Sequence, residues 1–254
     1  MAKIITIANQ KGGVGKTTTT VNLAASLAAA EKHTLVVDMD PQANATSGFG
    51  LNQEELEATI YQVMVSSKPL DQVIQKTNMD FLDIAPSHVD LIGAELELVS
   101  AISRETILSR ALERAKSPYD FILIDCPPSL GLLTLNALTA ADSVLVPLQC
   151  EYYALEGLSR LLGTIKLVKG ALNPSIELEG ILLTMFDPRN NLSHQVAKEA
   201  HNYFPGKVFR TIIPRNVKLS EAPSHGKPAI LYDISSIGAQ SYLTLAQEML
   251  NGKK

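Results

Sequence analysis

The residues best suited to chemistry lie near the start of the chain, in the run KIITIANQKGGVGKTTTT at positions 3–20. An apolar stretch is interrupted by glycines and followed by Lys16, Thr17 and a series of helix-forming residues. Glycines let backbone N–H groups turn toward the oxygens of a bound phosphate, and the N-terminus of the next helix adds a favourable dipole. Lys16 can then reach terminal phosphates, and the Thr17 hydroxyl is placed to bind magnesium. The run predicts a strand, a phosphate-binding loop and a helix.

The loop departs from the general pattern G-x-x-x-x-G-K-[ST] at its first position, where Gln10 replaces glycine and Lys11 follows. A K-G-G-x-G-K-[ST] loop is the deviant Walker A motif, with Lys11 as its signature lysine. The alternative is a glycine turn flanked by lysines through chance, but the apolar run before it and the helix formers behind it favour the phosphate loop. The sequence therefore predicts a nucleotide-binding protein.

Carboxylates follow a second apolar stretch, residues 34–37, which form a short predicted strand ending in Asp38-Met39-Asp40-Pro41-Gln42. Because α/β sheets bind ligands beyond the carboxyl ends of their strands, both aspartates are placed to face a nucleotide. Either could instead cap the following turn. That alternative stays open for Asp38, whereas for Asp40 we favour a chemical role.

The segment that begins with Tyr119-Asp120 continues as the apolar run Phe121-Ile122-Leu123-Ile124, typical of a strand buried on both faces, and ends in Asp125. This is the form of a Walker B strand, whose aspartate orients magnesium directly or through water. On its own the pattern is weak, because many buried strands end in aspartate, but after a phosphate loop it is strong. The stiff turn PPSLG at 127–131 is a candidate switch segment near the terminal phosphate.

The elements that must position these residues alternate along the chain. Further predicted strands cover 81–85, 143–147, 180–185 and a segment that ends at 212–216, and predicted helices follow residue 16 and cover much of 53–115, 154–168 and 243–250. The stretch 43–50 reads as a mobile loop. This alternation indicates an α/β fold: a doubly wound, mostly parallel sheet with helices on both faces, in a single domain over residues 1–254.

The composition is that of an ordinary soluble protein, with 254 residues, 46% of them hydrophobic, and no apolar run long enough to cross a membrane. The start of the chain lacks the features of a signal peptide. Cys126 and Cys150 are too few for a disulfide framework and lack metal-site spacing, so we expect both to be small buried residues. These features predict a cytoplasmic protein.

Charge is unevenly distributed along the chain. The formal net charge of −4 argues weakly against a general nucleic-acid-binding protein. Residues 50–115 carry 5 Lys/Arg against 11 Asp/Glu, whereas residues 160–230 carry 10 against 5. Such asymmetry can place a basic patch on an acidic protein, although on charge alone a solvated surface is the simpler interpretation.

Five segments together closely resemble the ParA/Soj family of chromosome-partitioning ATPases: KGGVGKTTTTVNLA, DMDPQANATSG, DCPPSLGLLT, QCEYYALEGL and IPRNVKLSEAPSHGKP. That family belongs to the deviant Walker A group, together with MinD and the nitrogenase iron protein. The similarity runs from about Lys3 to the final helix. The phosphate loop opens the sequence with no helix-turn-helix before it, which resembles the short, chromosomal type.

The resemblance implies an ATPase that acts as a nucleotide switch with bound Mg²⁺. In that family, Thr17 would bind the metal directly, Asp125 would support it, probably through water, and Asp40 would help to activate the attacking water. The implied catalytic residues are Lys11, Lys16, Asp40 and Asp125. The implied nucleotide site comprises Lys11, Gly12, Gly13, Val14, Gly15, Lys16, Thr17 and Thr18, with Pro214 and Asn216 against the adenine.

The resemblance also implies partners. Two subunits would enclose two ATP molecules, each Lys11 reaching the partner's phosphates, and the homodimer would bind DNA without sequence preference. Arg189, Arg215 and Lys218 match family positions linked to DNA contact, and Lys207, Arg210 and Lys227 are weaker candidates. A ParB-like partner would stimulate hydrolysis and release, so the protein is expected to be cytoplasmic and associated with the nucleoid.

Three other functions stay open at this point. A MinD-like membrane ATPase would need a basic amphipathic C-terminal helix, whereas the tail at 242–254 has few basic residues within its helix. An electron-transfer ATPase of the iron-protein type would need cluster-ligating cysteines, and neither Cys126 nor Cys150 lies in such a motif. A small-molecule kinase or synthetase would need an acceptor-binding constellation, and none is visible in the sequence.

Overall fold

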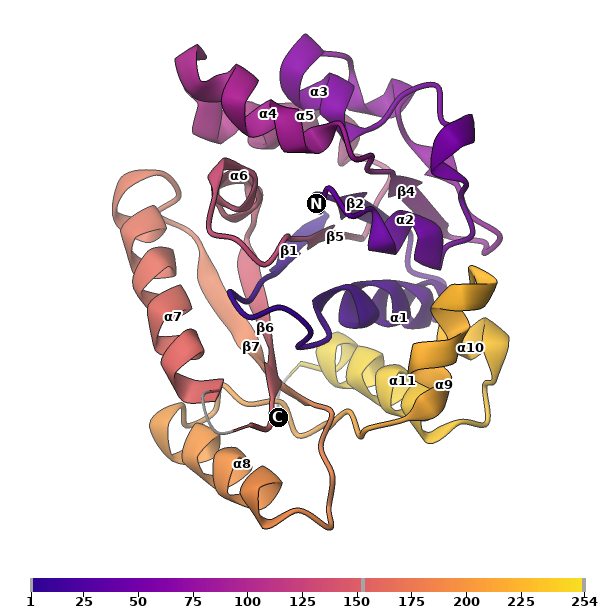
Figure 1. The fold of residues 1–254 in the computed structure, drawn as a ribbon, viewed down its shortest axis with the longest axis vertical. Coiled ribbons are helices and arrows are strands. Elements are labelled where there is room, and N and C mark those ends of the chain that lie inside the picture. Colours follow the sequence, from indigo (N-terminus) through magenta and orange to yellow (C-terminus); the bar gives the residue numbers. More distant parts are fainter. Residues whose placement is uncertain (1, 152–153, 253–254) are drawn as a thin grey trace.

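A seven-stranded sheet forms the centre of the molecule, in the order β3-β4-β2-β5-β1-β6-β7 (Figure 1). The computed structural model describes residues 2–151 and 154–252; Tyr152 and Tyr153 of the QCEYYALEGL segment and the terminal Lys253 and Lys254 lie outside the described residues. Neighbouring strands pair in parallel, except for β3 and β4, which are antiparallel. The strands are β1 (Lys3–Ile7), β2 (Thr34–Asp38), β3 (Gln75–Lys76), β4 (Leu82–Ala85), β5 (Phe121–Asp125), β6 (Ser143–Gln149) and β7 (Glu177–Thr184).

Helices connect the strands and cover both faces of the sheet (Figure 1). The α-helices are α1 (Lys16–Ala29), α2 (Asn44–Gly48), α3 (Ile60–Ser66), α4 (Leu91–Glu97), α5 (Ile107–Ala115), α6 (Leu132–Ala140), α7 (Ala154–Ala171), α8 (Asn191–Tyr203), α9 (Val217–Glu221), α10 (Ala229–Tyr232) and α11 (Ile237–Leu250). Short 3-10 turns cover Gln53–Glu55, Leu70–Gln72, Leu98–Ser100, Arg104–Thr106 and Ala222–His225. The doubly wound, mostly parallel α/β fold predicted from the sequence is confirmed.

Successive residues of the central strands point to opposite hydrophobic layers, as the period of a strand requires. On β1, Ile5 and Ile7 pack into a layer with α1 and α11, whereas Ile4 packs into a layer with α3 to α8. Because both faces of the sheet are buried in hydrophobic layers, strands such as β2 and β5 are apolar along nearly their whole length. Helices cover both faces of these strands, and the sequence therefore shows the strands as continuous apolar runs.

Cys126 and Cys150 are buried, as predicted.

The stretch 43–50, predicted as a loop, contains the short helix α2, so the prediction is wrong there. Asp38 lies at the end of β2 and accepts hydrogen bonds from the backbone N–H and the hydroxyl of Thr46, at 2.9 and 2.8 Å. Ala45 and Thr46 are fully buried. The turn is therefore fixed by a carboxylate from the preceding strand, a contact that local composition does not reveal.

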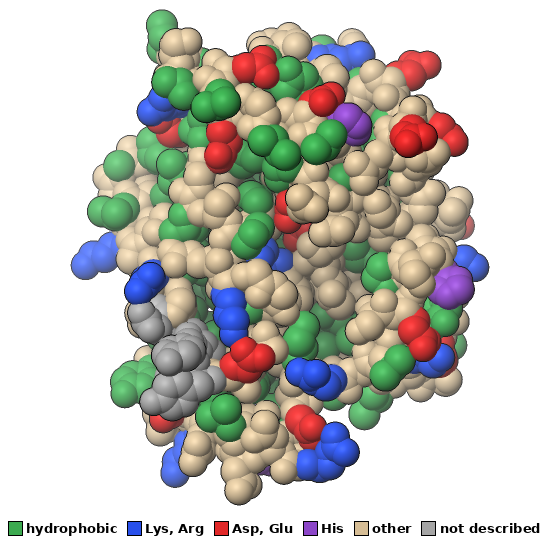
Figure 2. Space-filling model, in the orientation of Figure 1, with side chains coloured by type: hydrophobic (Ala, Val, Ile, Leu, Met, Phe, Trp, Pro, Cys, Tyr) green, Lys and Arg blue, Asp and Glu red, His purple; other side chains and the backbone are tan. Residues whose placement is uncertain are grey.

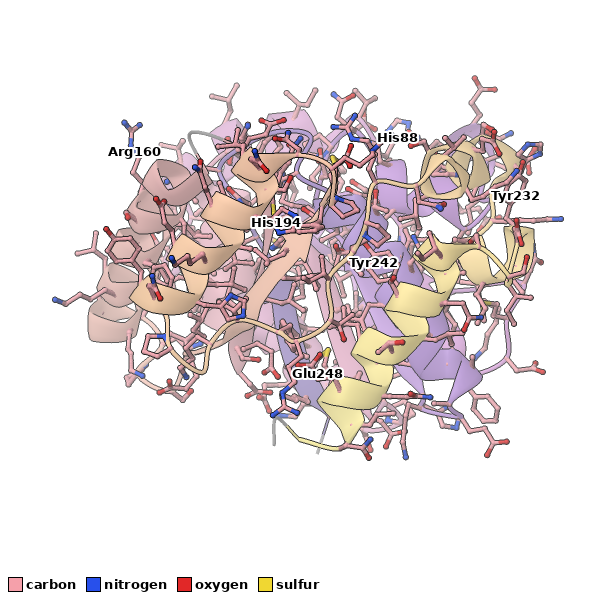
Figure 3. The ribbon with its side chains drawn as sticks, turned by 90° about the horizontal axis from the view of Figure 1, so that it is seen from below. His88, Arg160, His194, Tyr232, Tyr242 and Glu248 are labelled. Carbon is pink, nitrogen blue, oxygen red and sulfur yellow. The ribbon has the colours of Figure 1, made fainter. Side chains whose placement is uncertain are left out.

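The strand predicted to end at 212–216 is also absent from the described sheet. The segment instead runs along β7 and makes isolated bridges, Ile181 with Val208 and Phe186 with Pro214. The two bridges differ in register by one residue, so they do not join into a continuous ladder. Near the C-terminal end of α11, Glu248 accepts hydrogen bonds from the N–H groups of Arg210 and Thr211, which fastens this segment to the helix (Figure 3).

The register of the central strands brings three strand ends together. Asp125, the last residue of β5, is the register partner of Ile7 on β1 and of Asp38 on β2. The loop that follows β1, the turn that follows β2 and the turn that follows β5 therefore start at one edge of the sheet. This edge is where parallel α/β sheets bind ligands.

Candidate nucleotide-binding site

The loop between β1 and α1 has the backbone geometry that its glycines permit. Gly13 and Gly15 have φ angles of 74° and 88°, in the left-handed region that favours glycine. The Thr184 hydroxyl donates to the carbonyl of Val14 at 2.8 Å, and the Asn9 amide donates to the carbonyl of Pro147 at 2.7 Å. These contacts anchor the loop to β6 and β7, with α1 beginning directly behind it.

A cavity of about 360 Å³ lies at this loop. Its lining consists of Gly12, Gly13, Gly15, Lys16, Thr17, Thr18, Asp40, Gln42, Asn44, Pro128 and Met185. The walls therefore come from the ends of β1, β2, β5 and β7, which the sequence separates by up to about 170 residues. The loop, Asp40 and the turn after β5, each identified separately from the sequence, meet around one space.

Lys16 is the buried cation of this cavity, only 6% exposed. Its ammonium group donates to the carbonyl of Lys11 at 3.3 Å and forms no salt bridge with the described carboxylates. Burial lowers the pKa of Lys16, while the charge of nearby Asp125 acts in the opposite direction. An anion entering the cavity would stabilise this cation, because buried charges need a partner.

Asp125 receives two hydroxyl groups from α1. Thr17 Oγ1 donates to Oδ2 at 2.7 Å, and Thr20 Oγ1 donates to Oδ1 at 2.8 Å. Burial of Asp125 raises its pKa, and the nearby charge of Asp38 acts in the same direction, whereas the two hydroxyls favour the ionised form. A carboxylate and a hydroxyl in contact at the edge of a phosphate loop are oxygen ligands of the kind magnesium prefers.

The two aspartates after β2 have different surroundings. Asp38 is fully buried and accepts hydrogen bonds from the N–H groups of Asp40 and Thr46, so the capping interpretation left open for it describes its contacts well. Burial raises the pKa of Asp38 to about 6. Asp40 accepts one hydrogen bond, from the Gln42 N–H at 3.0 Å, and lines the cavity. Its second carboxylate oxygen makes no hydrogen bond with the described residues.

Lys11 forms a salt bridge with Glu151, two residues after the end of β6. Glu151 also accepts a hydrogen bond from the Gln149 side chain, and the Lys11 side chain is 40% exposed. The Lys11 backbone N–H donates to Asn9 Oδ1 at 3.0 Å, which fixes the start of the loop. The signature lysine is thus held by a carboxylate of its own chain at the rim of the cavity.

A second cavity of about 120 Å³ adjoins the first and shares Gly15, Thr18 and Met185 with it. Pro214 and Asn216 line this cavity, so the structure places both residues next to the loop. The side-chain oxygen Oδ1 of Asn216 accepts from the backbone N–H of Lys218 and caps α9, while the side-chain nitrogen Nδ2 makes no hydrogen bond with the described residues. That amide is available to a ligand.

Tyr242 of α11 closes the second cavity from below. It is 1% exposed and points from α11 toward α1 (Figure 3). Its hydroxyl lies 3.1 Å from the hydroxyl of Thr19 on α1. Burial raises the pKa of Tyr242 well above its ordinary range, so the phenol stays neutral.

Two of the three predicted DNA-contacting cations, Arg189 and Lys218, pair with different carboxylates. Arg189 donates two side-chain hydrogen bonds to Asp187, and the charge of Arg215 also acts on Asp187, so these two arginines lie near one carboxylate. Lys218 lies on α9, where it pairs with Glu221 at 2.9 Å and lies over the Tyr232 ring. Among the weaker candidates, Lys207, Arg210 and Lys227 are exposed, and Lys227 lines a cavity between α1 and the turn before α10.

The contacts of Thr20 and Glu151 are among those of this site that were not predicted from the sequence. Thr20 has a usable signal: it follows Thr17 by three residues and therefore shares its face of α1. Glu151 has no such signal in the sequence, because it stands 140 residues from Lys11.

The fold and the loop together define a P-loop nucleotide-binding protein of the deviant Walker A type.

Comparison with known proteins places the chain within that class. A family model described as an AAA domain matches residues 2–178. The chain is 59% identical over 250 residues to chromosome partitioning protein ParA of Myxococcus xanthus, covering 98% of this chain and 88% of the relative. It is 59% identical over 249 residues to sporulation initiation inhibitor protein Soj of Bacillus subtilis, covering 98% of each. The chain therefore belongs to the ParA/Soj family of chromosome-partitioning proteins.

A solved structure supports the fold assignment. The crystal structure of cobyrinic acid a,c-diamide synthase from Mycobacterium smegmatis with bound ADP and magnesium superposes with a TM-score of 0.86 at 35% identity. The match covers 99% of this chain and 95% of that one.

Within the described part of this chain, no helix is both long and apolar enough to cross a membrane.

Proposed function

We propose that the protein is an ATP-dependent switch for chromosome or plasmid segregation, in which residues 1–254 act as one ATPase domain. With ATP bound, two subunits form a dimer that binds DNA without sequence preference. A ParB-like partner stimulates hydrolysis, and the dimer then releases DNA. Membership of the ParA/Soj family supports this cycle, and the nucleotide cavity supplies its chemistry.

The observation that carries the proposal is the buried Lys16 ammonium, which has no salt bridge with a described carboxylate, inside a cavity walled by a glycine loop. Backbone N–H groups, a helix N-terminus and a cation surround a space that suits a polyphosphate. The adjoining cavity at Pro214 and Asn216 suits the adenine, because it offers an apolar wall and a free amide. The bound ADP and magnesium of the M. smegmatis structure agree with this assignment.

The side chains next to the loop also fit magnesium. Thr17 Oγ1 and Asp125 Oδ2, already in contact at 2.7 Å, are hard oxygen donors. Thr17 would hold the ion directly and Asp125 through a water molecule. The ion would neutralise charge on the phosphates. Because burial raises the pKa of Asp125, a nearby cation would also favour its ionised form.

The hydrolytic step depends on positioning and charge. Lys16 holds the terminal phosphate, and the free Asp40 oxygen accepts a hydrogen bond from the attacking water and orients it. Lys11 completes the charge stabilisation from the partner subunit. In the free subunit its ammonium is held by Glu151, so dimerisation exchanges this carboxylate for the partner's phosphates. Hydrolysis is thereby tied to dimer formation, as it is when a partner supplies an arginine finger.

DNA binding is assigned to Arg189, Arg215 and Lys218. Each of the pairs with Asp187 and Glu221 lies at the surface, where an ion pair contributes little to stability, so phosphates can replace the carboxylates. Dimerisation doubles the number of contacts with DNA, so basic residues that bind DNA weakly in one subunit bind it more tightly in the dimer. In the cell, this binding would place the ATP-bound dimer on the nucleoid.

The proposal is tested by measuring DNA binding with ATP, with ADP and without nucleotide, using fluorescence anisotropy on two unrelated duplexes. We expect binding confined to ATP and equal on both duplexes. Equal binding in all three states would contradict the switch. Pelleting with anionic liposomes in the ATP state would instead favour a MinD-like function, and ATP turnover that requires an added acceptor substrate would favour a synthetase.

A further inference from the structure

A cavity of about 400 Å³ lies among α3, α4 and α5, apart from the nucleotide site. Its lining shares no residue with the cavities around the phosphate loop. The floor is apolar and includes the buried side chains Val63, Met64 and Leu70, and Ile102 at the rim is 91% exposed. Figure 2 shows hydrophobic side chains gathered at this end of the molecule, where Figure 1 places α3, α4 and α5. The volume is in the range of small-molecule sites.

Three cations line this cavity: Lys68, Arg110 and Arg114. Asp71 is the acidic residue in the lining, so the local charge is positive. Residues 50–115 as a whole carry 5 Lys/Arg against 11 Asp/Glu. The cavity is therefore positively charged, although the segment that forms it is acidic overall.

The three cations that line the cavity differ from the other Lys/Arg of residues 50–115, which form salt bridges. Lys76 pairs with Asp83, and Arg104 pairs with Glu105. The remaining three Lys/Arg of the segment are the three that line the cavity, and none of them forms a salt bridge with a described residue. The segment carries 11 Asp/Glu, yet none of its described carboxylates forms a salt bridge with these three cations.

The two arginines also share a face of one helix. Arg110 and Arg114 are four residues apart on α5, and both line the cavity. Like charges at this spacing destabilise an isolated helix. An anion between them would reverse this effect, because guanidinium groups bind carboxylate, sulfonate or phosphate oxygens with paired hydrogen bonds.

We propose that this cavity is a binding site for a small amphipathic anion, a molecule with an apolar body and one acidic head group. The apolar body would lie on Val63, Met64 and Leu70, and the head group would bind Arg110 and Arg114. Lys68 adds charge at the opposite wall. The site does not depend on the proposed nucleotide cycle, since the two cavities have no lining residue in common.

Two dyes with the same rings provide the test. The anionic probe is 8-anilino-1-naphthalenesulfonate, and the neutral probe is N-phenyl-1-naphthylamine, which lacks only the sulfonate. Binding is measured by fluorescence titration of the full-length protein. The variants are the double substitution Arg110→Gln/Arg114→Gln and the cavity-filling Ala111→Phe, which keeps both arginines. The matched control is Lys116→Gln, one residue beyond α5, whose ammonium pairs with Glu113 outside the cavity.

We expect the anionic dye to bind the wild type more tightly than the neutral dye. The double variant should lose roughly tenfold in affinity for each charge-assisted hydrogen bond removed. Ala111→Phe should abolish binding of both dyes, and Lys116→Gln should leave it unchanged. Binding of a fluorescent ATP analogue should stay at the wild-type level in all variants.

Equal affinity for the two dyes would overturn the proposal, and so would unchanged binding in the double variant. A loss in Lys116→Gln as large as that in the double variant would also overturn it, because it would show binding to surface charge alone. If the double variant lost ATP binding and was therefore misfolded, Ala111→Phe decides the question. Retention of the anionic dye by that variant would refute the site.

Discussion

Thr20→Val removes the hydroxyl of Thr20 while keeping the shape of its side chain, and so deletes its hydrogen bond to Asp125 together with its 3.1 Å contact with the carbonyl of Lys16. Thr20 is fully buried, and its hydroxyl lies 2.8 Å from Asp125 Oδ1. A hydrogen bond to a charged group contributes about 1.5–3 kcal/mol to stability. In a chain of this size, each kcal/mol shifts Tm by about 2–4 °C. We therefore expect Tm to fall by roughly 3–12 °C when Asp125 is ionised.

The loss should depend on pH in a definite direction. Burial raises the pKa of Asp125 from 3.8 to about 8, so the folded state keeps the Asp125 proton to higher pH than the unfolded chain does. The stability associated with this group is therefore present at low pH and is lost as pH rises through about 8. Without Thr20 the pKa rises further, because a donor to the ionised form is gone. The deficit should be smaller at pH about 6 and largest at pH about 9.

Thermal unfolding of the nucleotide-free protein, followed by circular dichroism, measures this effect. Thr139→Val is the matched control, since the Thr139 hydroxyl is buried and has no hydrogen-bond partner among the described residues. Replacing such a group is expected to be neutral or slightly stabilising. If Thr20→Val were no less stable than Thr139→Val at the higher pH, the assigned role of Thr20 at Asp125 would be wrong.

Four further predictions concern the nucleotide cycle. Lys16→Ala should abolish productive ATP binding and with it dimerisation, because the buried ammonium has no substitute in the loop; ATP-dependent dimerisation in light scattering would refute this. Lys11→Ala should still bind ATP as a monomer but fail to form the dimer or hydrolyse ATP, and a loss of ATP binding as severe as in Lys16→Ala would show that Lys11 acts in its own subunit. Asp40→Ala should bind ATP and dimerise, with turnover reduced about 10²- to 10⁴-fold, and normal phosphate release would leave Asp40 as a turn residue. Arg189→Ala and Lys218→Ala should each lower the salt slope of DNA binding by about one per contact, hence roughly two per dimer, with dimerisation intact; an unchanged slope in both would move the DNA site elsewhere.

Several features of this protein follow from the sequence alone because their causes are local. The glycines of the phosphate loop sit at the positions where left-handed backbone is needed, as at Gly13 and Gly15. Strands buried on both faces must be apolar throughout, so β2 and β5 are visible as continuous runs that end in Asp38 and Asp125. The motifs that resemble the ParA/Soj family are also short stretches of sequence, and the relatives confirm the resemblance.

Other features were decided by tertiary structure. The stretch that forms α2 is polar and rich in small residues, and it is helical because the Asp38 carboxylate holds Thr46. Thr20 contacts Asp125 because β5 lies beside β1 in the sheet, which brings the start of α1 over the end of β5. Lys11 meets Glu151 because β6 flanks β1 on the other side. Contacts of this kind depend on strand order, and strand order is set by the packing of the whole chain, so no local pattern of residues encodes them.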